Sequence, residues 1–432
     1  MHFTGEIPTP KNDSRLDLIA AMLLILVLAV ATLFPENFVT GVPVFASQRS
    51  FPLTLLLPFA AVWGVVYIVA RRKLIKPGVV DGLVIAFMAY IFLRNISGLE
   101  SFVVFKFAVF GVFIFYASSL LTENSERLLR IVIYVILGLL LLTAVYGLVE
   151  YVFQKNFIYA KYISESVREP IVGLHRIGST LAHPVSYGAF LIQALPFSVL
   201  VWLQSRGRVR ILAVAATIAG VLALFFTYSK GSWIVAVVVS LGALLLVRGR
   251  MSRKYLLPAI IVAALIISLV AIFWQQIVSE TEIRSFESFD VRLSAWRAAI
   301  AGFADHPVIG VGYKQGSGEL KKHISPTLYE GLYPDQPVDN NYLSQLLEAG
   351  IIGFALWILV LMFVILEGVG VARARSPGSP LALAALASII GISLNMMTFE
   401  SLQLWPNFVF FWLAAGILHG LAMRRGPAAG HI

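Results

Sequence analysis

The sequence predicts an all-α polytopic membrane protein, and composition, long apolar runs and the placement of basic residues each support that fold class. Of its 432 residues, 59% are hydrophobic and 13% are charged, whereas soluble globular proteins carry about 25% charged residues. This composition excludes a soluble enzyme, a disordered chain and a coiled coil.

About twelve apolar runs are long enough to cross a membrane, because a spanning helix needs about 20 mostly apolar residues. The first run follows a polar stretch, and no small-residue cleavage site follows it, so we expect a retained first helix and not a removed signal peptide. The predicted spans are 16–35, 51–70, 80–96, 102–121, 130–152, 180–203, 210–228, 231–247, 255–277, 342–370, 380–398 and 404–423.

Basic residues concentrate in alternate connections between these spans. The short loops 71–76, 204–210, 248–254 and 371–379 are each basic. Because cytoplasmic loops are rich in Lys and Arg, this pattern predicts that both termini lie inside. The same loops explain the net charge of +10, so we expect no nucleic-acid partner.

Two outer connections divide the chain into three parts. Residues 1–277 hold the first nine spans and a shorter outer loop, 153–179. Residues 278–341 form a long outer loop between spans 9 and 10, and residues 342–432 hold the last three spans and a cytoplasmic tail. Loops this long are uncommon and often functional. In 289–304 the apolar residues recur at helical spacing, which predicts an amphipathic helix in a partly helical loop.

Several kinds of chemistry are excluded or disfavoured by what the sequence lacks. The absence of cysteine excludes a thiol nucleophile, a Cys-based zinc site and a disulfide. No Walker-type glycine loop, GxSxG elbow or HExxH helix occurs, and the seven histidines are scattered. We therefore expect neither a cofactor nor a metal ion.

Polar and charged residues gather at the outer ends of the predicted spans. Charges at membrane depth are costly, so they usually face a cavity and mark a substrate path. We expect Arg94 and Lys106, near outer helix ends, to reach the lipid headgroups. The remaining candidates lie in the stretches 175–184, 227–231, 292–313 and 339–353.

These four stretches resemble, in the same order, the motifs of the O-antigen ligase and polymerase superfamily of bacterial envelope glycan enzymes. Ser179-Thr180 stands without the second glycine of the first motif, Lys230 replaces an arginine, and Asp339 stands where many members have histidine. The matching residues are Arg176, Gly178 and His183-Pro184; Ser229-Lys230-Gly231; Arg292, Trp296, His306-Pro307, Gly310 and Gly312; and Asn340-Asn341-Tyr342-Leu343 with Glu348 and Gly350.

The resemblance implies an enzyme of the inner membrane whose active site faces the periplasm. It would move a glycan from a polyprenyl-diphosphate carrier to an acceptor hydroxyl. A cluster of Arg176, Lys230 and Arg292 would hold the diphosphate without a metal, because guanidinium groups bind such anions bidentately and stay charged. Asp339 is the first candidate for a catalytic base and His323 the second.

Each of these residues also has an ordinary structural interpretation. His183 before Pro184 could be a satisfied histidine at a helix kink, and Asp339 or Asn340 could cap the following helix. Tyr342 could be an interfacial anchor. We nevertheless assign His183, Asn340 and Tyr342 to substrate binding, with the three basic residues.

Within the superfamily, the four motifs do not separate the subfamilies, and we favour a ligase with lipid A–core as acceptor. A polymerase that extends another glycan and a protein O-oligosaccharyltransferase remain open. An organic-anion transporter is the alternative of another class, although no pair of matching interrupted helices is present. A flippase or scaffold without catalysis is a third possibility. The sequence fixes neither the glycan nor the oligomeric state.

Overall fold

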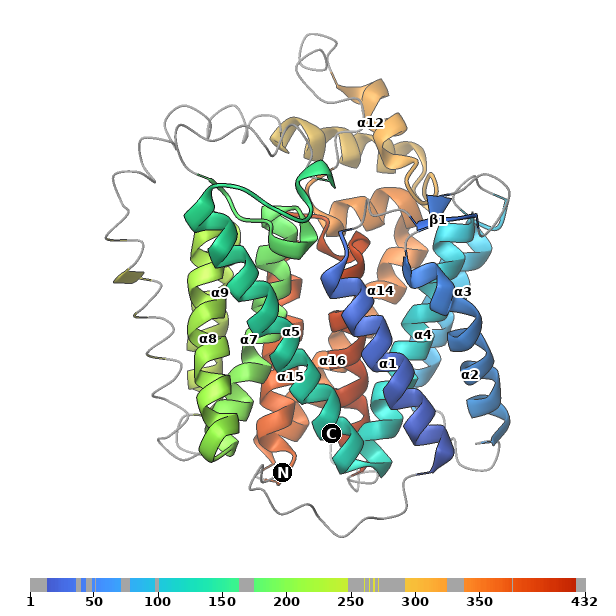
Figure 1. The fold of residues 1–432 in the computed structure, drawn as a ribbon. Coiled ribbons are helices and arrows are strands. Elements are labelled where there is room, and N and C mark those ends of the chain that lie inside the picture. The colour runs from blue at the N-terminus through green and yellow to red at the C-terminus, as the bar shows by residue number, and fades with distance from the viewer. Residues whose placement is uncertain are drawn as a thin grey trace.

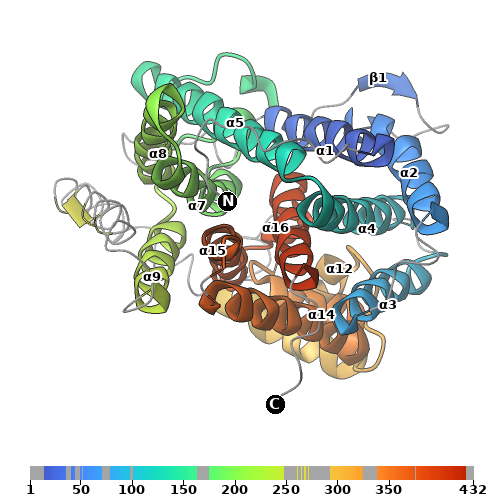
Figure 2. The same ribbon diagram turned by 90° about the horizontal axis from the view of Figure 1, so that it is seen from below.

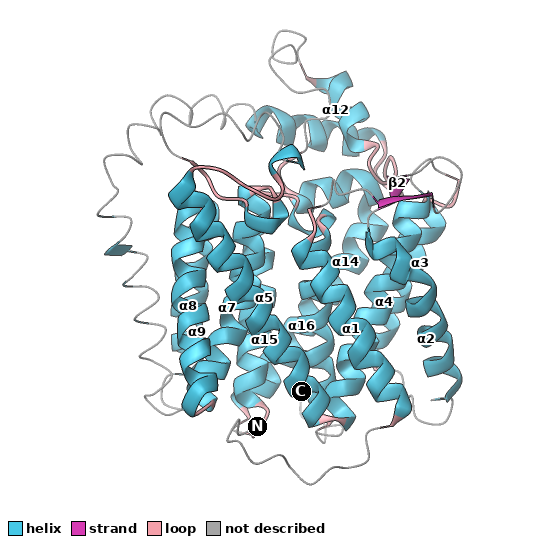
Figure 3. Ribbon diagram, in the orientation of Figure 1, coloured by secondary structure: helices cyan, strands magenta, loops and turns pink. Residues whose placement is uncertain are grey.

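A computed structural model of the chain is almost entirely helical (Figure 3). It describes residues 14–35, 40–43, 49–50, 52–70, 78–97, 101–162, 175–247, 292–324, 338–374 and 376–424, with a few isolated positions between 260 and 271. One small departure from the predicted all-α class is an antiparallel pair of short strands, β1 (Thr40–Pro43) and β2 (Arg49–Ser50), near the outer end of the bundle.

The helices form a bundle that carries a cap at one end, which is the end predicted to face outward (Figure 1). Helix α1 begins and α16 ends at the end opposite the cap, as expected for an even number of crossings. The main helices are α1 (Arg15–Leu33), α2 (Leu57–Ala70), α3 (Val79–Arg94), α4 (Ser101–Asn124), α5 (Glu126–Phe153), α7 (Pro184–Gln204), α8 (Gly207–Phe226), α9 (Lys230–Val247), α12 (Gly316–His323), α14 (Asn341–Arg373), α15 (Ser379–Asn395) and α16 (Trp405–Met423).

The predicted polytopic membrane fold is confirmed. By length and composition, seven helices in the described part of the chain could cross a membrane, and three shorter apolar helices accompany them. Eleven predicted spans correspond to helices, with boundaries that differ by a few residues. The remaining prediction, 255–277, falls almost wholly outside the described residues. The count of twelve spans and the inward termini stay predictions.

Helix α16 lies at the centre of the bundle, between α4, α14 and α15 (Figure 2). Two glycines spaced four residues apart permit its close contact with α4. A Cβ atom on Gly416 would collide with the carbonyl oxygen of Phe115, and one on Gly420 with that of Ser119. Small residues at this spacing let membrane helices pack backbone to backbone.

The cap is built from the long outer loop. Residues 292–305 form a helix that includes most of the predicted 289–304, whereas 289–291 lie outside the described residues. Helix α12 packs beside it against the start of α14. Their buried apolar residues form a small cluster of their own, separate from the core of the bundle: Ala298, Ala299, Leu320, Ile324, Val338 and Leu347.

Helix α14 is broken at Gly350, where the backbone has φ 63° and ψ −172°. The loop at 307–312 repairs the break. Val311 and Gly312 donate their N–H groups to the carbonyls of Leu347 and Glu348 at 3.0 and 2.9 Å. The freed N–H of Ile351 donates to the carbonyl of Pro307 at 2.9 Å. Two of the four matched motifs therefore meet in one backbone junction.

Arg94 and Lys106 were predicted to extend to the lipid headgroups, but both bind oxygen atoms of the protein. Arg94 donates from Nε and Nη2 to the carbonyls of Ile309 and Gly310 at 2.9 and 2.6 Å, which fixes the junction to the end of α3. Lys106 is 8% exposed, and its Nζ lies 3.5 Å from Oγ1 of Thr54. Both long cationic side chains thus bond to oxygen atoms of the protein itself.

Candidate functional site

The first two predicted motifs meet at the outer ends of α7, α8 and α9. Arg176 donates from Nε to the carbonyl of Thr227 at 3.1 Å, and the N–H of Ile177 donates to the carbonyl of Phe226 at 3.2 Å. Thr227 lies three residues before Lys230, the exposed first residue of α9. The cations Arg176 and Lys230 therefore belong to one region of the outer surface.

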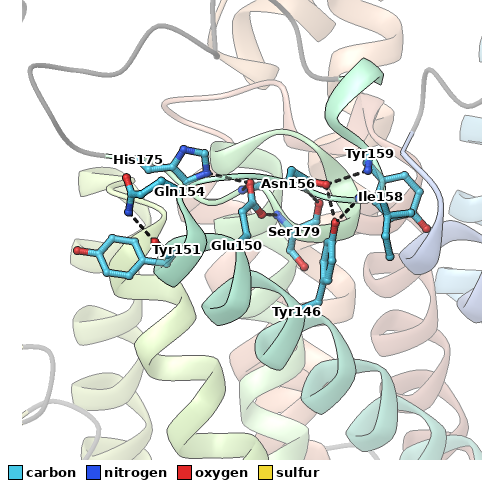
Figure 4. Close-up of polar contacts among 10 residues, drawn as sticks. Tyr146, Glu150, Tyr151, Gln154, Asn156, Ile158, Tyr159, His175 and Ser179 are labelled. Carbon is cyan, nitrogen blue, oxygen red and sulfur yellow. Dashed lines mark hydrogen bonds and ion pairs between the residues drawn. The ribbon is translucent and has the colours of Figure 1, made fainter.

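A buried carboxylate contacts residues on both sides of Arg176, the side chain of His175 before it and the backbone after it (Figure 4). Glu150, 1% exposed near the end of α5, accepts the N–H groups of Gly178 at 3.4 Å and Ser179 at 2.7 Å. Nε2 of His175 lies 3.3 Å from the same carboxylate. Asn156 also donates to the carbonyl of Ser179 at 2.9 Å. This network fixes the loop from which Arg176 projects.

His183 caps a helix and does not mark a kink. Its Nδ1 accepts the N–H of Ser186 at 3.3 Å, and Pro184 occupies the first turn of α7. Its ring stacks on Phe399 with centroids 5.3 Å apart. Burial, and then the charge of Arg176, lower the pKa of His183 to about 4, so the ring is neutral near pH 7.

The third and fourth motifs meet in an ion pair. Nε of Arg292 lies 3.3 Å from Oδ2 of Asp339. Trp296, one turn later, donates from Nε1 to the carbonyl of Val338 at 3.0 Å. Burial raises the pKa of the Asp339 carboxyl, although the charge and hydrogen bond of Arg292 act in the opposite direction. Arg292 retains further N–H donors, since a guanidinium carries five.

Asn340, and not Asp339, caps α14. Its Oδ1 accepts the N–H groups of Tyr342 at 3.0 Å and Leu343 at 3.2 Å. Asp339 stands just before the cap with φ 53°, a backbone conformation that is uncommon outside glycine. The Tyr342 hydroxyl donates to the carbonyl of Ser393 at 2.9 Å, which ties α14 to α15. Asn340 and Tyr342 therefore each have a structural role, as the cap of α14 and as a link between α14 and α15. Their predicted part in substrate binding stays a prediction.

The loop between α15 and α16, residues 396–404, connects the two halves of the site. Phe399 stacks on His183, and Oε1 of Glu400 accepts the N–H of Val338 at 2.9 Å. Thr398 lies against Gly231, directly after Lys230. The segment that precedes this loop joins it through Asn395, whose Nδ2 donates to Oγ of Ser232 at 3.2 Å. The loop thus places Arg176 and Lys230 on one flank and Arg292 and Asp339 on the other.

Glu400 is the acidic group that the sequence analysis missed. Burial raises its pKa to about 7, the hydrogen bond from Val338 opposes this shift, and the charge of Asp339 adds to it. A carboxyl with a pKa near the working pH is suited to general acid–base catalysis. The sequence did contain a signal for Glu400, because it is a single acidic residue in the short turn between two apolar spans. Glu150, an acidic residue inside a predicted span, was a signal of the same kind.

His323 belongs to a different cluster. On α12, its Nε2 lies 3.1 Å from Oδ2 of Asp305 and 3.6 Å from Oε1 of Glu319. Within the described part of the chain these acidic partners are Asp305 and Glu319 and not Asp339, so the catalytic role of His323 stays a prediction. The ligand atoms of these three residues lie within 4.8 Å of one another and could hold a metal ion, although Lys322 already pairs with Glu319 at 2.7 Å.

Comparison with known proteins gives one family. Residues 215–358 match the model described as O-antigen ligase. That range includes Lys230, Arg292 and Asp339, whereas Arg176 and Glu400 lie outside it. No curated protein matches the chain.

Proposed function

Because residues 215–358 carry an O-antigen ligase family domain, we propose that the protein is a metal-independent membrane glycosyltransferase. It transfers a glycan from a polyprenyl-diphosphate carrier to an acceptor hydroxyl at the periplasmic face of the bacterial inner membrane. The acceptor we favour is lipid A–core oligosaccharide, which makes the enzyme an O-antigen ligase.

The observation that carries this proposal is the presence of cations and two half-buried carboxyls around loop 396–404. Arg176, Lys230 and Arg292 supply positive charge on both flanks of the loop, and Asp339 and Glu400 supply two carboxyls with raised pKa values. A transporter for an organic anion needs the cations. Transfer to a hydroxyl needs in addition a group that accepts a proton, and this site contains two.

The reaction follows from these groups. The acceptor hydroxyl gives its proton to a carboxylate and attacks the anomeric carbon of the glycan. The bond from that carbon to the diphosphate oxygen breaks, and the released carrier diphosphate carries the additional negative charge. Arg176, Lys230 and Arg292 stabilise this charge where it develops, which is usually the largest contribution to such catalysis.

Glu400 is the stronger candidate for the base, and Asp339 supports it. A carboxyl with a pKa of about 7 is half ionised near neutral pH and accepts a proton more readily than an ordinary carboxylate. The negative charge of Asp339 contributes to that raised pKa. Asp339 in turn orients Arg292 toward the diphosphate through their ion pair.

The proposal is tested with purified protein, a polyprenyl-diphosphate glycan and three acceptors: lipid A–core, a second carrier-linked glycan and a Ser/Thr peptide. Transfer to lipid A–core alone, without nucleotide and in the presence of EDTA, supports the ligase. Transfer to the second glycan identifies a polymerase, and transfer to the peptide a protein O-oligosaccharyltransferase. No transfer to any acceptor contradicts the enzyme assignment.

A further inference from the structure

A cavity lies between α3, α4, α14 and α16. It holds about 730 Å³ of empty space, part of which is open to solvent. Figure 2 shows these four helices around the same part of the bundle.

The lining of this cavity changes from polar to apolar with depth. Polar groups from the ends of α3 and α14 and from the segment before α16 surround its outer end. Along α3, the lining runs over eight residues from Asn95 to Phe87, which corresponds to roughly 12 Å of depth. The polar lining residues are Asn95, Gln345, Glu348 and Gln403, and the deep apolar ones include Phe87, Met88, Phe408 and Trp412.

Two buried side chains in the lining have unsatisfied polar atoms. Oε1 of Glu348 accepts the N–H of Lys314 at 2.9 Å, but Oε2 has no hydrogen-bond partner in the described part of the chain. Nε1 of Trp357 also has none among the described residues. The two residues are 7% and 2% exposed. Buried polar atoms are nearly always paired, so a group from outside the chain is the natural partner.

The charge of the lining selects the ligand. Neither Lys nor Arg is among the described residues that line the cavity, so this lining offers no cation to pair with a phosphate. The anionic carrier of the proposed reaction does not suit this site. A neutral lipid linkage, such as an amide or a hydroxyl, can bond to the polar outer end while a hydrocarbon chain fills the apolar floor.

We propose that this cavity is a second lipid site, which takes the acyl chain of an outer-leaflet lipid and binds its amide or hydroxyl group at Glu348. The inference does not depend on the proposed transfer, because it concerns occupancy by a lipid and not turnover. It also requires that the polyprenyl carrier binds elsewhere.

The test uses the purified protein in phosphatidylcholine nanodiscs that contain one of two photoreactive probes. One probe is an N-acyl sphingolipid with a diazirine in its acyl chain, and the other is an isoprenyl phosphate with a diazirine at similar depth. After irradiation, mass spectrometry locates the adducts. We expect the acyl probe to label Trp357, Phe408 or Trp412, and the isoprenyl probe to leave them unlabelled.

Two variants control this result. Ala108→Phe places a ring in the lining and should reduce labelling of the cavity by the acyl probe at least fivefold. Val65→Phe adds a ring at a position that is 62% exposed on α2 and should leave it unchanged. Unaltered labelling in a folded Ala108→Phe protein, adducts confined to lipid-facing residues of the wild type, or stronger cavity labelling by the isoprenyl probe would each overturn the proposal.

Discussion

Asp339 and Glu400 differ in the way that their surroundings control ionisation. Arg292 contacts Asp339 directly and favours its charged form, whereas Glu400 accepts a single backbone N–H and is exposed to the charge of Asp339. Two carboxyls with different environments can take different roles in one reaction. Two substitutions separate these roles.

Replacing Glu400 by Gln should remove the pH dependence of transfer. In the wild type, the carboxyl is protonated below its pKa of about 7, so kcat/KM should rise tenfold per pH unit up to that value and then level off. The raised pKa also means that the folded state binds the proton more tightly, so this carboxyl stabilises the fold at low pH and loses that contribution as pH rises from about 4.5 to 7.

In Glu400→Gln, both the inflection in kcat/KM and this loss of stability should disappear, with activity reduced by about 10²–10⁴-fold. A pH profile that keeps its inflection near 7 in the variant would exclude Glu400 as the base.

Asp339→Asn addresses the partner carboxyl. Asn340 is the cap of α14, so the substitution leaves the cap in place and removes the ion pair to Arg292. Arg292 is 41% exposed, and such pairs contribute at most about 1 kcal/mol, so the melting temperature should hardly change. Transfer should fall at least tenfold. Full activity, measured on the same preparation as the melting temperature, would reduce Asp339 to a structural residue.

Some residues of the candidate site could be predicted from the sequence and others could not. Arg176, Lys230, Arg292 and Asp339 were predicted as site residues from the four matched motifs, and they lie around one loop. Glu150 and Glu400 were not predicted as site residues, because each accepts a hydrogen bond from a backbone N–H group that is distant in the sequence, some 28 and 62 residues away. No local pattern in the sequence predicts such a contact.

At the scale of elements, the break in α14 determines where the fourth motif lies. A continuous span was predicted from 342, but the segment up to Ala349 belongs to the outer cap and only the part after Gly350 continues into the bundle (Figure 1). In the sequence, Gly350 stands out only as part of the fourth motif. The sequence could not reveal that the loop at 307–312 supplies the hydrogen bonds that stabilise the break.

Gly350→Ala tests this junction. The position needs φ 63°, and an added Cβ would collide with the carbonyl of Val308. We expect a loss of stability of about 1–3 kcal/mol from strain, and a loss of transfer because Asp339 shifts with its segment. The matched control is Gly370→Ala in the same helix, where a Cβ meets nothing within 4 Å. Equal melting temperatures and activities for the two variants would contradict the role of the break.

At the scale of the whole molecule, composition and apolar runs were sufficient to predict a polytopic helical protein, because lipid requires every backbone group to be paired within the segment. Composition and apolar runs do not predict which side of the membrane each loop faces. That prediction rests only on the basic residues in the loops. The absence of cysteine permits a direct test.

Single cysteines at Lys155 and Arg208, both exposed at opposite ends of the bundle, report the topology. In intact spheroplasts, a membrane-impermeant maleimide should label Lys155→Cys, whereas Arg208→Cys should react only after lysis. The reverse pattern would place the candidate site in the cytoplasm and exclude transfer at the periplasmic face.

The most direct test of the central claim, that cations around loop 396–404 hold a lipid diphosphate, is the turnover of three arginine variants with one donor and one acceptor. Arg176→Ala and Arg292→Ala should each lose at least the equivalent of a charge-assisted contact, about 1.5–3 kcal/mol, and so fall tenfold or more in kcat/KM. Arg297→Ala, one turn along the same helix as Arg292 and exposed, should remain near wild type. Near-normal turnover in both Arg176→Ala and Arg292→Ala would contradict the account.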